Sequence, residues 1–243
     1  MHKKNIPILM YHSIQSEKKG AKLRGLSVSP MLFKVQMFTL KLLGYKGLSM
    51  GNLEPYLTGK KRGKVFGITF DDGYQNNYIF ALPILKKYRF TATCYIISNN
   101  IDGINHWDIK KGITIKKMMN HNEIKDWINE GMEIGSHSSN HLYLSKLDNN
   151  QLKEEILHSK INLEKQYKTK IKHFCYPYGD KDSKIVEFVR KCGYVSATTT
   201  SRGLASPQSN LFELPRVLIN HRTYPHLLLL KFLTNYENNR QKT

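Results

Sequence analysis

The apolar positions of the chain form two kinds of pattern, short continuous runs and helical spacings. The runs at 6–12 and 65–70 have the length of buried strands, and the run at 91–97 is rich in β-branched and aromatic residues. Between the first two runs, Ser29 gives a helix start and Gly44 a helix stop. Further strands are predicted at 131–135, 173–176, 194–198 and 214–219, and further helices at 78–88, 123–129, 148–167, 183–191 and near the C-terminus.

This alternation of strands and helices predicts a mostly parallel sheet. The stretch 98–117 is polar, contains two Gly and predicts an irregular insertion. Because no break in composition and no internal repeat occurs, we expect residues 1–243 to form a single α/β domain. In such folds ligands bind at the C-terminal ends of the strands, so the residues there are the first candidates for function.

The composition adds a strong positive charge. Lys and Arg number 38 against 19 Asp and Glu, which gives a formal net charge of +19. This excess favours a polyanionic partner such as nucleic acid, an acidic membrane leaflet or a phosphate-bearing substrate. The basic residues are scattered, however, and the abundance of Lys, Asn and Ile equally favours compositional drift. Nucleic-acid sites interleave basic and aromatic residues on one face, and no such stripe occurs, so no nucleic-acid partner is expected.

Three cysteines, Cys94, Cys175 and Cys192, lack CxxC spacing. Their odd number argues against a disulfide framework and a structural zinc site and indicates reduced thiols. The first apolar run is too short for a signal peptide, and no run approaches the ~18 residues that span a bilayer. We therefore expect a cytoplasmic protein, with a peripheral position on the inner membrane leaflet as the alternative that its charge allows.

Polar residues gather at the predicted strand ends. Asp71 and Asp72 end the second strand, where two ionised carboxylates repel each other. They are either part of an ordinary Asp-Asp-Gly turn or a cation ligand beside a general base. His137 and His141 have the i,i+4 spacing that puts two imidazoles on one face of a helical turn, within reach of one metal ion. The alternative is a polar loop with solvated histidines. Other strand ends carry His12, Tyr176-Pro177-Tyr178, Arg216 and His221.

Three ordered motifs resemble one known family. TFDDG at 69–73, HSSNH at 137–141 and YPYG at 176–179 resemble the polysaccharide deacetylases of the NodB-homology type, carbohydrate esterase family 4. The resemblance extends from about residue 6 to residue 219. LMYHSI near the N-terminus and ELPRV at 213–217 are similar to the circularly permuted branch that includes the poly-N-acetylglucosamine deacetylases. The fold implied by this resemblance is a distorted (β/α)7 barrel.

The resemblance also implies roles for the motif residues. Asp71 resembles the general base, and Asp72, His137 and His141 resemble the ligands of a divalent metal, first of all Zn²⁺, with Co²⁺, Ni²⁺, Mn²⁺ or Fe²⁺ as alternatives. The backbone N–H of Tyr178 resembles an oxyanion donor. For substrate binding the expected residues are Tyr74, Tyr176, Pro177 and His221.

Two roles need residues from outside these motifs. The family commonly has an Arg two positions before the Pro of the third motif, where this chain has Cys175. Arg216 is therefore expected to orient the base. In the permuted branch the N-terminal strand supplies the general acid, which here is His12, with His221 as the rival.

The function implied is a metal-dependent hydrolase that removes an N-acetyl group from an amino sugar of a bacterial glycan. The positive net charge and the expected cytoplasmic location together suggest a sugar that is carried on an anionic lipid at the inner membrane leaflet. The alternatives are a deformylase acting on a formamido sugar-lipid, a catalytically silent glycan-binding module and a basic nucleic-acid-binding protein.

Overall fold

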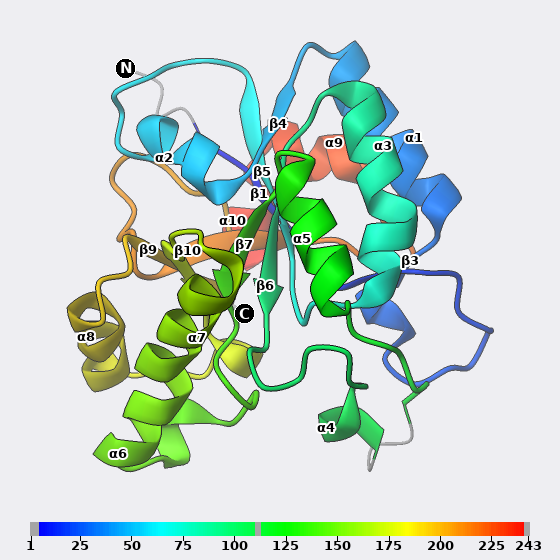
Figure 1. Cartoon of the computed structure of the whole chain (residues 1–243). Coiled ribbons are helices and arrows are strands. Elements are labelled where there is room, and N and C mark those ends of the chain that lie inside the picture. Colours follow the sequence, from blue (N-terminus) through cyan, green and yellow to red (C-terminus); the bar gives the residue numbers. More distant parts are fainter. Residues whose placement is uncertain (1–4, 110–112, 241–243) are drawn as a thin grey trace.

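A closed barrel of parallel strands forms the centre of the computed structural model, which describes residues 5–109 and 113–240 (Figure 1). The strand β1 (Ile8–Tyr11) closes the ring, because it pairs with β10 (Leu214–Leu218) on one side and with β5 (Val65–Phe70) on the other. The ring is completed by β6 (Thr93–Ile96), β7 (Glu133–Ser136), β8 (His173–Cys175) and β9 (Ser196–Arg202). This architecture confirms the predicted (β/α)7 barrel.

An excursion that the apolar pattern does not predict closes one end of the barrel. It consists of β4 (Lys46–Leu48) and α2 (Met50–Leu57). The strand β4 pairs with the first half of β5, before β6 begins to pair. Apolar side chains of α2 cluster with Ile8 and Tyr95 inside the barrel. The N-terminal ends of the strands are thereby covered, and the C-terminal ends are left for a site.

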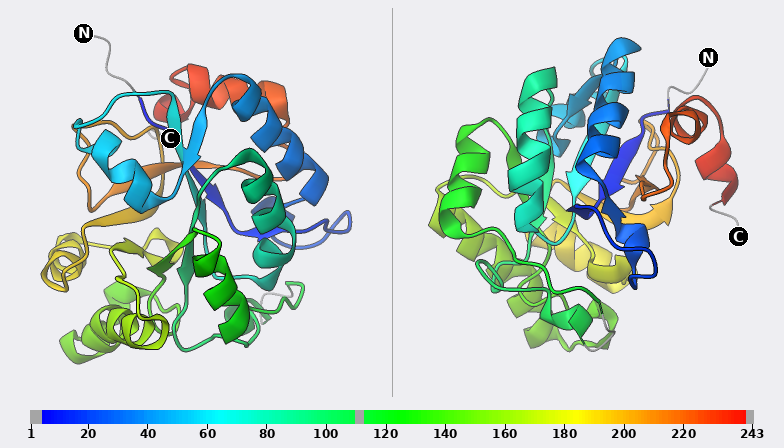
Figure 2. Two further views of the ribbon diagram at one scale, coloured as in Figure 1. Left: turned by 45° about the horizontal axis from the view of Figure 1, so that its top comes forward. Right: turned by 90° about the vertical axis from the view of Figure 1, so that its right-hand side faces the viewer.

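Helices cover the outer faces of the strands (Figure 2). The helix α1 (Pro30–Leu42) begins where the sequence predicts, because Ser29 Oγ accepts a hydrogen bond from the backbone N–H of Leu32 at 3.2 Å. Outward-facing strand residues such as Phe66 and Ile68 belong to the main apolar core. No helix in the described parts of the chain is long and apolar enough to cross a membrane. The other outer helices are α3 (Leu82–Tyr88), α5 (His121–Asn129), α8 (Ser183–Lys191), α9 (Pro225–Leu233) and α10 (Tyr236–Asn239).

The predicted helix over 148–167 is present but is not regular. Asp148 caps its start, as expected from the sequence. Between α6 (Asn149–Leu152) and α7 (Ser159–Tyr167) lies a π-helical segment, Lys153–His158. Segments of this kind are rare and occur frequently at functional sites.

Of the stretch 98–117, the structure describes 98–109 and 113–117, which are largely irregular, as predicted, and contain the short helix α4 (His106–Ile109). The stretch contacts a small sheet of β2 (Ser13–Ile14) and β3 (Ser27–Val28). Lys116 Nζ donates hydrogen bonds to the serine hydroxyls of both strands, at 3.0 and 2.9 Å. The insertion is therefore fastened to the segments that follow the first barrel strand.

Candidate active site

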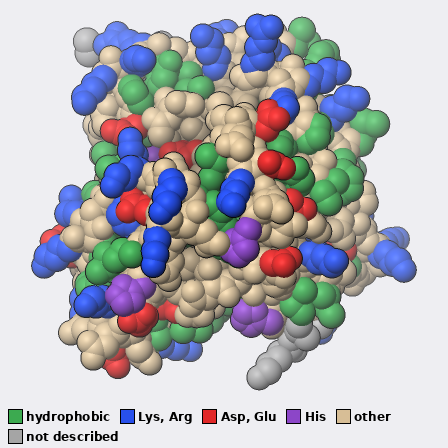
Figure 3. Space-filling model, viewed as in Figure 1, with side chains coloured by type: hydrophobic (Ala, Val, Ile, Leu, Met, Phe, Trp, Pro, Cys, Tyr) green, Lys and Arg blue, Asp and Glu red, His purple; other side chains and the backbone are tan. Residues whose placement is uncertain are grey.

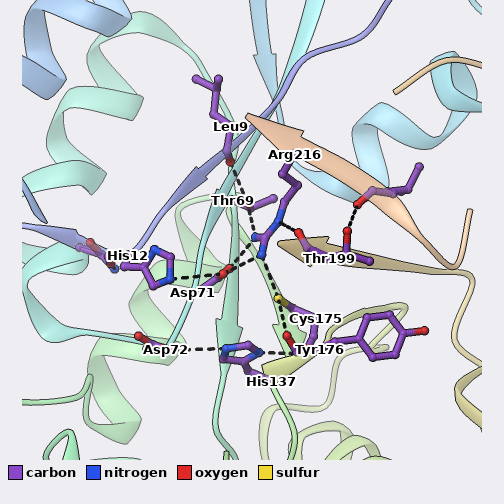
Figure 4. A network of polar contacts seen from close by, with 12 residues as sticks. Leu9, His12, Thr69, Asp71, Asp72, His137, Cys175, Tyr176, Thr199 and Arg216 are labelled. Atoms are coloured by element: carbon purple, nitrogen blue, oxygen red, sulfur yellow. Dashed lines mark hydrogen bonds and ion pairs between the residues drawn. The ribbon is translucent and has the colours of Figure 1, made fainter. Parts of the chain in front are cut away.

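Asp71 and Arg216 form a buried, two-pronged ion pair at the C-terminal end of β5 (Figure 4). Arg216 Nη1 and Nη2 donate to Oδ1 and Oδ2 of Asp71 at 2.7 and 2.8 Å. The same guanidinium donates to the backbone oxygen of Thr199 at 2.8 Å and to Thr69 Oγ1 at 3.0 Å. Its Nη2 also lies 3.3 Å from Cys175 Sγ. These contacts hold the planar guanidinium, and with it the carboxylate, in one orientation.

The charge state of Asp71 follows from this pair. Burial alone would raise the pKa of Asp71, but the charge and hydrogen bonds of Arg216 outweigh burial and hold that pKa below its ordinary value. Asp71 is consequently ionised at neutral pH and can accept a proton from a group in the pocket.

Asp72, His137 and His141 bring one carboxylate oxygen and two imidazole nitrogens together. Asp72 Oδ1 lies 3.3 Å from Nε2 of His137 and 3.5 Å from Nε2 of His141. All three side chains are buried, and their possible ligand atoms lie within 4.8 Å of one another. One carboxylate and two imidazoles suit Zn²⁺ or a similar divalent cation, so this donor set fits the metal that the resemblance implies.

The ring orientations support the same assignment. His137 Nδ1 lies 2.8 Å from the backbone oxygen of Cys175. Since a carbonyl only accepts, Nδ1 carries a proton and Nε2 is the ring atom that faces Asp72. Metal-binding imidazoles are usually oriented by a partner of this kind. Burial, and then the charge of His137, lower the pKa of His141 to about 3, which keeps the His141 ring neutral.

The loop 137–141 is not the helical turn that the i,i+4 spacing predicts. Its second and fifth residues adopt left-handed φ values of 64° and 59°, which no α-helix allows. The carboxylate of Glu155, in the π-helical segment, accepts hydrogen bonds from the backbone N–H groups of Ser139 and Asn140 at 3.2 and 2.9 Å. The two imidazoles therefore converge through a folded loop that a buried carboxylate holds in place.

His12 lies on another side of Asp71. Its Nε2 is 3.8 Å from Asp71 Oδ2, and its side chain is 15% exposed. Asn77 Nδ2 donates to the backbone oxygen of His12 at 2.7 Å and so fixes the segment that follows β1. An imidazole at this place can exchange a proton with a ligand in the pocket.

A pocket of about 120 Å³ opens over these residues. Aromatic rings form part of its wall. The rings of Trp107 and Tyr178 lie 4.8 and 4.5 Å from the ring of His141, and Tyr143 stacks on Tyr178 at 4.1 Å. Flat apolar rings beside polar groups are suited to a sugar ring. The pocket is also lined by Leu23, Leu26, Asp108, Tyr176 and Thr200.

The third motif forms a tight turn, Pro177–Gly179, that brings Tyr178 to the pocket. Tyr178 has φ 59° and ψ 2°, a left-handed conformation that is unusual for a residue with a side chain. Gly179 follows at φ 72°, and a Cβ there would lie 2.0 Å from Thr200 Oγ1. Only glycine fits this position, because both the φ value and the space exclude a side chain.

Three predicted substrate residues do not line the pocket. Tyr74 is 3% exposed and contacts Asp72, and burial and then the Asp72 charge raise the pKa of its hydroxyl. Pro177 is buried within its turn. His221 lies in a separate hollow beside Arg24. The structure therefore brings His12, and not His221, to Asp71.

Other residues of the site were not selected from the sequence. Trp107 and Asp108 enter from the irregular insertion, where one of the two tryptophans of the chain stands among polar residues. Leu23 has a left-handed φ of 51°, for which the sequence gives no signal. In the sequence, Glu155 is one polar position of an ordinary amphipathic helix, and no local pattern marks it as part of the site.

Comparisons with known proteins agree with this geometry. The model of the family described as polysaccharide deacetylase matches residues 58–197. The Bacillus subtilis (strain 168) protein YxkH, which carries the provisional name of a polysaccharide deacetylase, is 32% identical over 88% of this chain and 71% of its own length. The poly-beta-1,6-N-acetyl-D-glucosamine N-deacetylase of Staphylococcus aureus (strain MRSA252) is 28% identical over 85% of this chain and 72% of its own.

A solved structure extends the likeness to three dimensions. The Streptococcus pyogenes deacetylase PplD, solved in complex with acetate, is similar with a TM-score of 0.82 and 29% identity over 95% of this chain and 99% of its own. Together with the family match over more than half of the sequence, this establishes the family. The chain belongs to the polysaccharide deacetylase family.

Proposed function

We propose that this protein is a metal-dependent N-deacetylase that hydrolyses the acetamido group of an amino sugar in a bacterial glycan. The proposal rests on one observation: two neighbouring carboxylates in the same pocket have different partners. Asp72 faces two imidazoles, whereas its neighbour Asp71 faces a guanidinium. The first arrangement suits a cation ligand and the second suits a base, as amide hydrolysis requires.

The residues that would hold the metal are Asp72, His137 and His141. The chemistry that a divalent cation supplies in such a site is polarisation of the amide carbonyl and a lower pKa for bound water. A role for Zn²⁺ in particular rests on the donor set of one carboxylate and two imidazoles.

Asp71 accepts the proton of the attacking water. Arg216 keeps the carboxylate of Asp71 ionised and in a fixed orientation, because its guanidinium donates a hydrogen bond to each carboxylate oxygen from the side away from the pocket. The backbone N–H of Tyr178 donates to the oxyanion that forms as the carbonyl carbon becomes tetrahedral. His12 donates a proton to the sugar nitrogen as the carbon–nitrogen bond breaks, so that a neutral amine leaves. The products are acetate and a free amino sugar.

The substrate class follows from the pocket walls and from the relatives. The rings of Trp107, Tyr143 and Tyr178 provide a surface for a sugar. The Staphylococcus aureus relative is named for its action on poly-beta-1,6-N-acetyl-D-glucosamine, and PplD was solved with acetate, the product expected here. Two further points stay predictions that rest on the positive net charge: that the sugar is carried on a lipid, and that the protein contacts the inner membrane leaflet.

Acetate release from defined oligosaccharides tests the proposal. The purified protein is incubated with β-1,6- and β-1,4-linked tetramers of N-acetylglucosamine and with their N-formyl analogues, with and without a chelator. We expect mass loss of one acetyl group that stops with the chelator and returns with added Zn²⁺. Release of formate alone would assign the deformylase activity instead, and no release under any condition would refute hydrolysis of these amides.

A further inference from the structure

A second hollow lies next to the active-site pocket, on the other side of the segment 23–27. It has a volume of about 180 Å³, larger than the pocket over Asp71. Leu23 and Leu26 line the active-site pocket, whereas Arg24 and Ser27 of the same segment line the second hollow. A glycan lying across this segment would reach both.

The charge of the second hollow is positive. Arg24 has no ion pair with any carboxylate among residues 5–109 and 113–240. The carboxylate that also lines the hollow, Glu17, is neutralised, because its Oε1 lies 2.9 Å from Lys116 Nζ and only 7% of its side chain is exposed. The guanidinium is therefore the uncompensated charge in this hollow, and it suits an oxyanion.

Neutral polar groups accompany this charge. Nδ1 of His221 is buried and has no hydrogen-bond partner within the described chain. Gln15 accepts a hydrogen bond from Asn76 through its amide oxygen at 3.1 Å, so its amide nitrogen is turned elsewhere as a donor. Buried polar atoms without partners are rare in folded proteins and call for a ligand or water.

An aromatic ring stands at the rim. Tyr224 lines the hollow and is 53% exposed, with its ring roughly parallel to that of His226. A half-exposed tyrosine offers a flat apolar surface with a polar end, which is suited to a sugar ring. The hollow thus combines a platform, a cation and neutral polar groups within one depression.

We propose that this hollow is an accessory subsite for a sugar unit that carries an oxyanion, a carboxylate or a phosphate, so that the enzyme's preferred substrate is an anionic N-acetylated glycan. The inference rests on the proposed N-deacetylase function and adds the substrate class to it. The net charge of +19 and the Lys and Arg side chains spread over the visible face agree with attraction of a polyanion (Figure 3).

Binding tests the subsite without any turnover. The probes are a neutral tetramer of N-acetylglucosamine and two tetramers of equal length whose alternate units carry a lactyl carboxylate or a 6-phosphate. NMR signals of the His221 ring are followed during titration. We expect them to shift with one or both anionic tetramers and not with the neutral one, and to stay unshifted in Arg24→Gln. No shift with either anion in the wild type would overturn the subsite, and a shift with only one identifies the oxyanion.

Kinetics test its role in catalysis. The wild type is expected to have a kcat/KM for the anionic tetramer at least about tenfold above that for the neutral one, because charge-assisted hydrogen bonds are of this strength. Arg24→Gln should remove that preference, so that kcat/KM for the anionic tetramer falls to about the value for the neutral one. Arg222→Gln, a neighbouring cation outside the hollow, is the matched control and should keep the preference. Equal kcat/KM values in the wild type, or an equal loss for both substrates in Arg24→Gln, contradict the inference.

The two proposals fail separately. If no tetramer is deacetylated, the N-deacetylase function is refuted, and the His221 titration still decides whether the hollow binds an oxyanion. If the neutral tetramer is deacetylated as fast as the anionic ones, the function stands and the accessory subsite falls.

Discussion

Arg216 and Asp71 lie 145 positions apart in the chain and meet through two parallel hydrogen bonds of 2.7 and 2.8 Å. The barrel makes this possible, because β1 lies between β5 and β10 and both strands point the same way. The guanidinium occupies the space beside Cys175 Sγ, at 3.3 Å. An arginine from a different strand thus serves the carboxylate in place of the one that the third motif lacks.

Replacement of this arginine by lysine should slow catalysis. Arg216→Lys keeps a positive charge but loses the two-pronged contact, so Asp71 is held less firmly and its pKa rises. A base acts when ionised, so activity is present above the pKa of Asp71 and is lost as the pH falls through it. We expect kcat to fall by about 10²-fold or more and the acidic limb of kcat/KM to move to higher pH.

The pH profile of acetate release, measured beside thermal unfolding, checks this prediction. Cys175→Ala serves as the control, since it touches the same guanidinium without carrying its charge, and it should keep the wild-type acidic limb. An unchanged acidic limb in Arg216→Lys would show that the guanidinium does not set the charge state of the base.

The carboxylate of Glu155 should tune the metal site without touching it. In the wild type, Oε2 of Glu155 accepts from both backbone N–H groups and Oε1 accepts from Asn140 Nδ2 at 2.6 Å, so Glu155→Gln sets an NH2 donor against one of these donors. The loop 137–141 then loosens, and supports of this kind are typically worth 10- to 100-fold in metal affinity. Competition for Zn²⁺ with a chromophoric chelator measures the change. Glu154→Gln, the exposed neighbour, is the matched control, and equal affinities in both variants would contradict the role of Glu155.

Gly135, two residues before His137, should not tolerate a methyl group. A Cβ there would lie 2.5 Å from the ring of Tyr95 and 2.8 Å from the backbone oxygen of His173. Overpacking in a closed barrel typically costs about 1–3 kcal/mol. We expect Gly135→Ala to lower the free energy of unfolding in denaturant by that amount. At Gly25, where a Cβ meets nothing within 4 Å, the same substitution should be neutral. A wild-type free energy of unfolding for Gly135→Ala would show that the barrel interior can relax.

A second buried carboxylate should make stability depend on acid pH. Glu237 is fully buried and is paired with Arg202 at 2.8 Å and with Lys231. Burial alone would raise the pKa of Glu237, but these two cations outweigh it and lower that pKa. Its stabilisation is therefore present above the unfolded pKa of about 4.3 and is lost as the pH falls through the folded value.

Glu237→Gln should cost about 3 kcal/mol near neutral pH, because it leaves two cations without their partner. The difference in unfolding free energy between wild type and variant should then shrink as the pH falls below about 4. Chemical denaturation at a series of pH values measures both quantities. A difference that stays constant down to pH 3 would mean that the ionised form of Glu237 is not the source of the stabilisation.

The strands and the motif residues were predictable because their signals are local. The runs at 6–12 and 65–70 are continuous and apolar, and a parallel barrel brings the residues after them together whatever the loops do. The excursion of β4 and α2 was missed because Gly51 and Pro55 interrupt its helical pattern. The pairing of β4 with β5 and the contacts of α2 with the barrel interior stabilise it there.

The finer geometry of the site depends on contacts between distant segments. The structure brings HSSNH beside Asp72, but not as a helical turn, because Glu155 in another element holds the loop. Because His221 follows a predicted strand, the sequence makes it the rival candidate for the general acid near Asp71. The structure places it beside Arg24 in the second hollow. No periodic pattern marks Trp107, whose place depends on how the insertion folds back over the pocket.

The most direct test of the account is acetate release by Asp71→Asn from an N-acetylglucosamine tetramer at matched metal content. Asparagine fills the same space and leaves Asp72, His137 and His141 intact. The prediction is wild-type metal stoichiometry with activity reduced by about 10²- to 10⁴-fold, the usual contribution of a general base. His137→Ala, run beside it, should lose the metal itself. Wild-type acetate release by metal-loaded Asp71→Asn would contradict the division of roles between the two carboxylates.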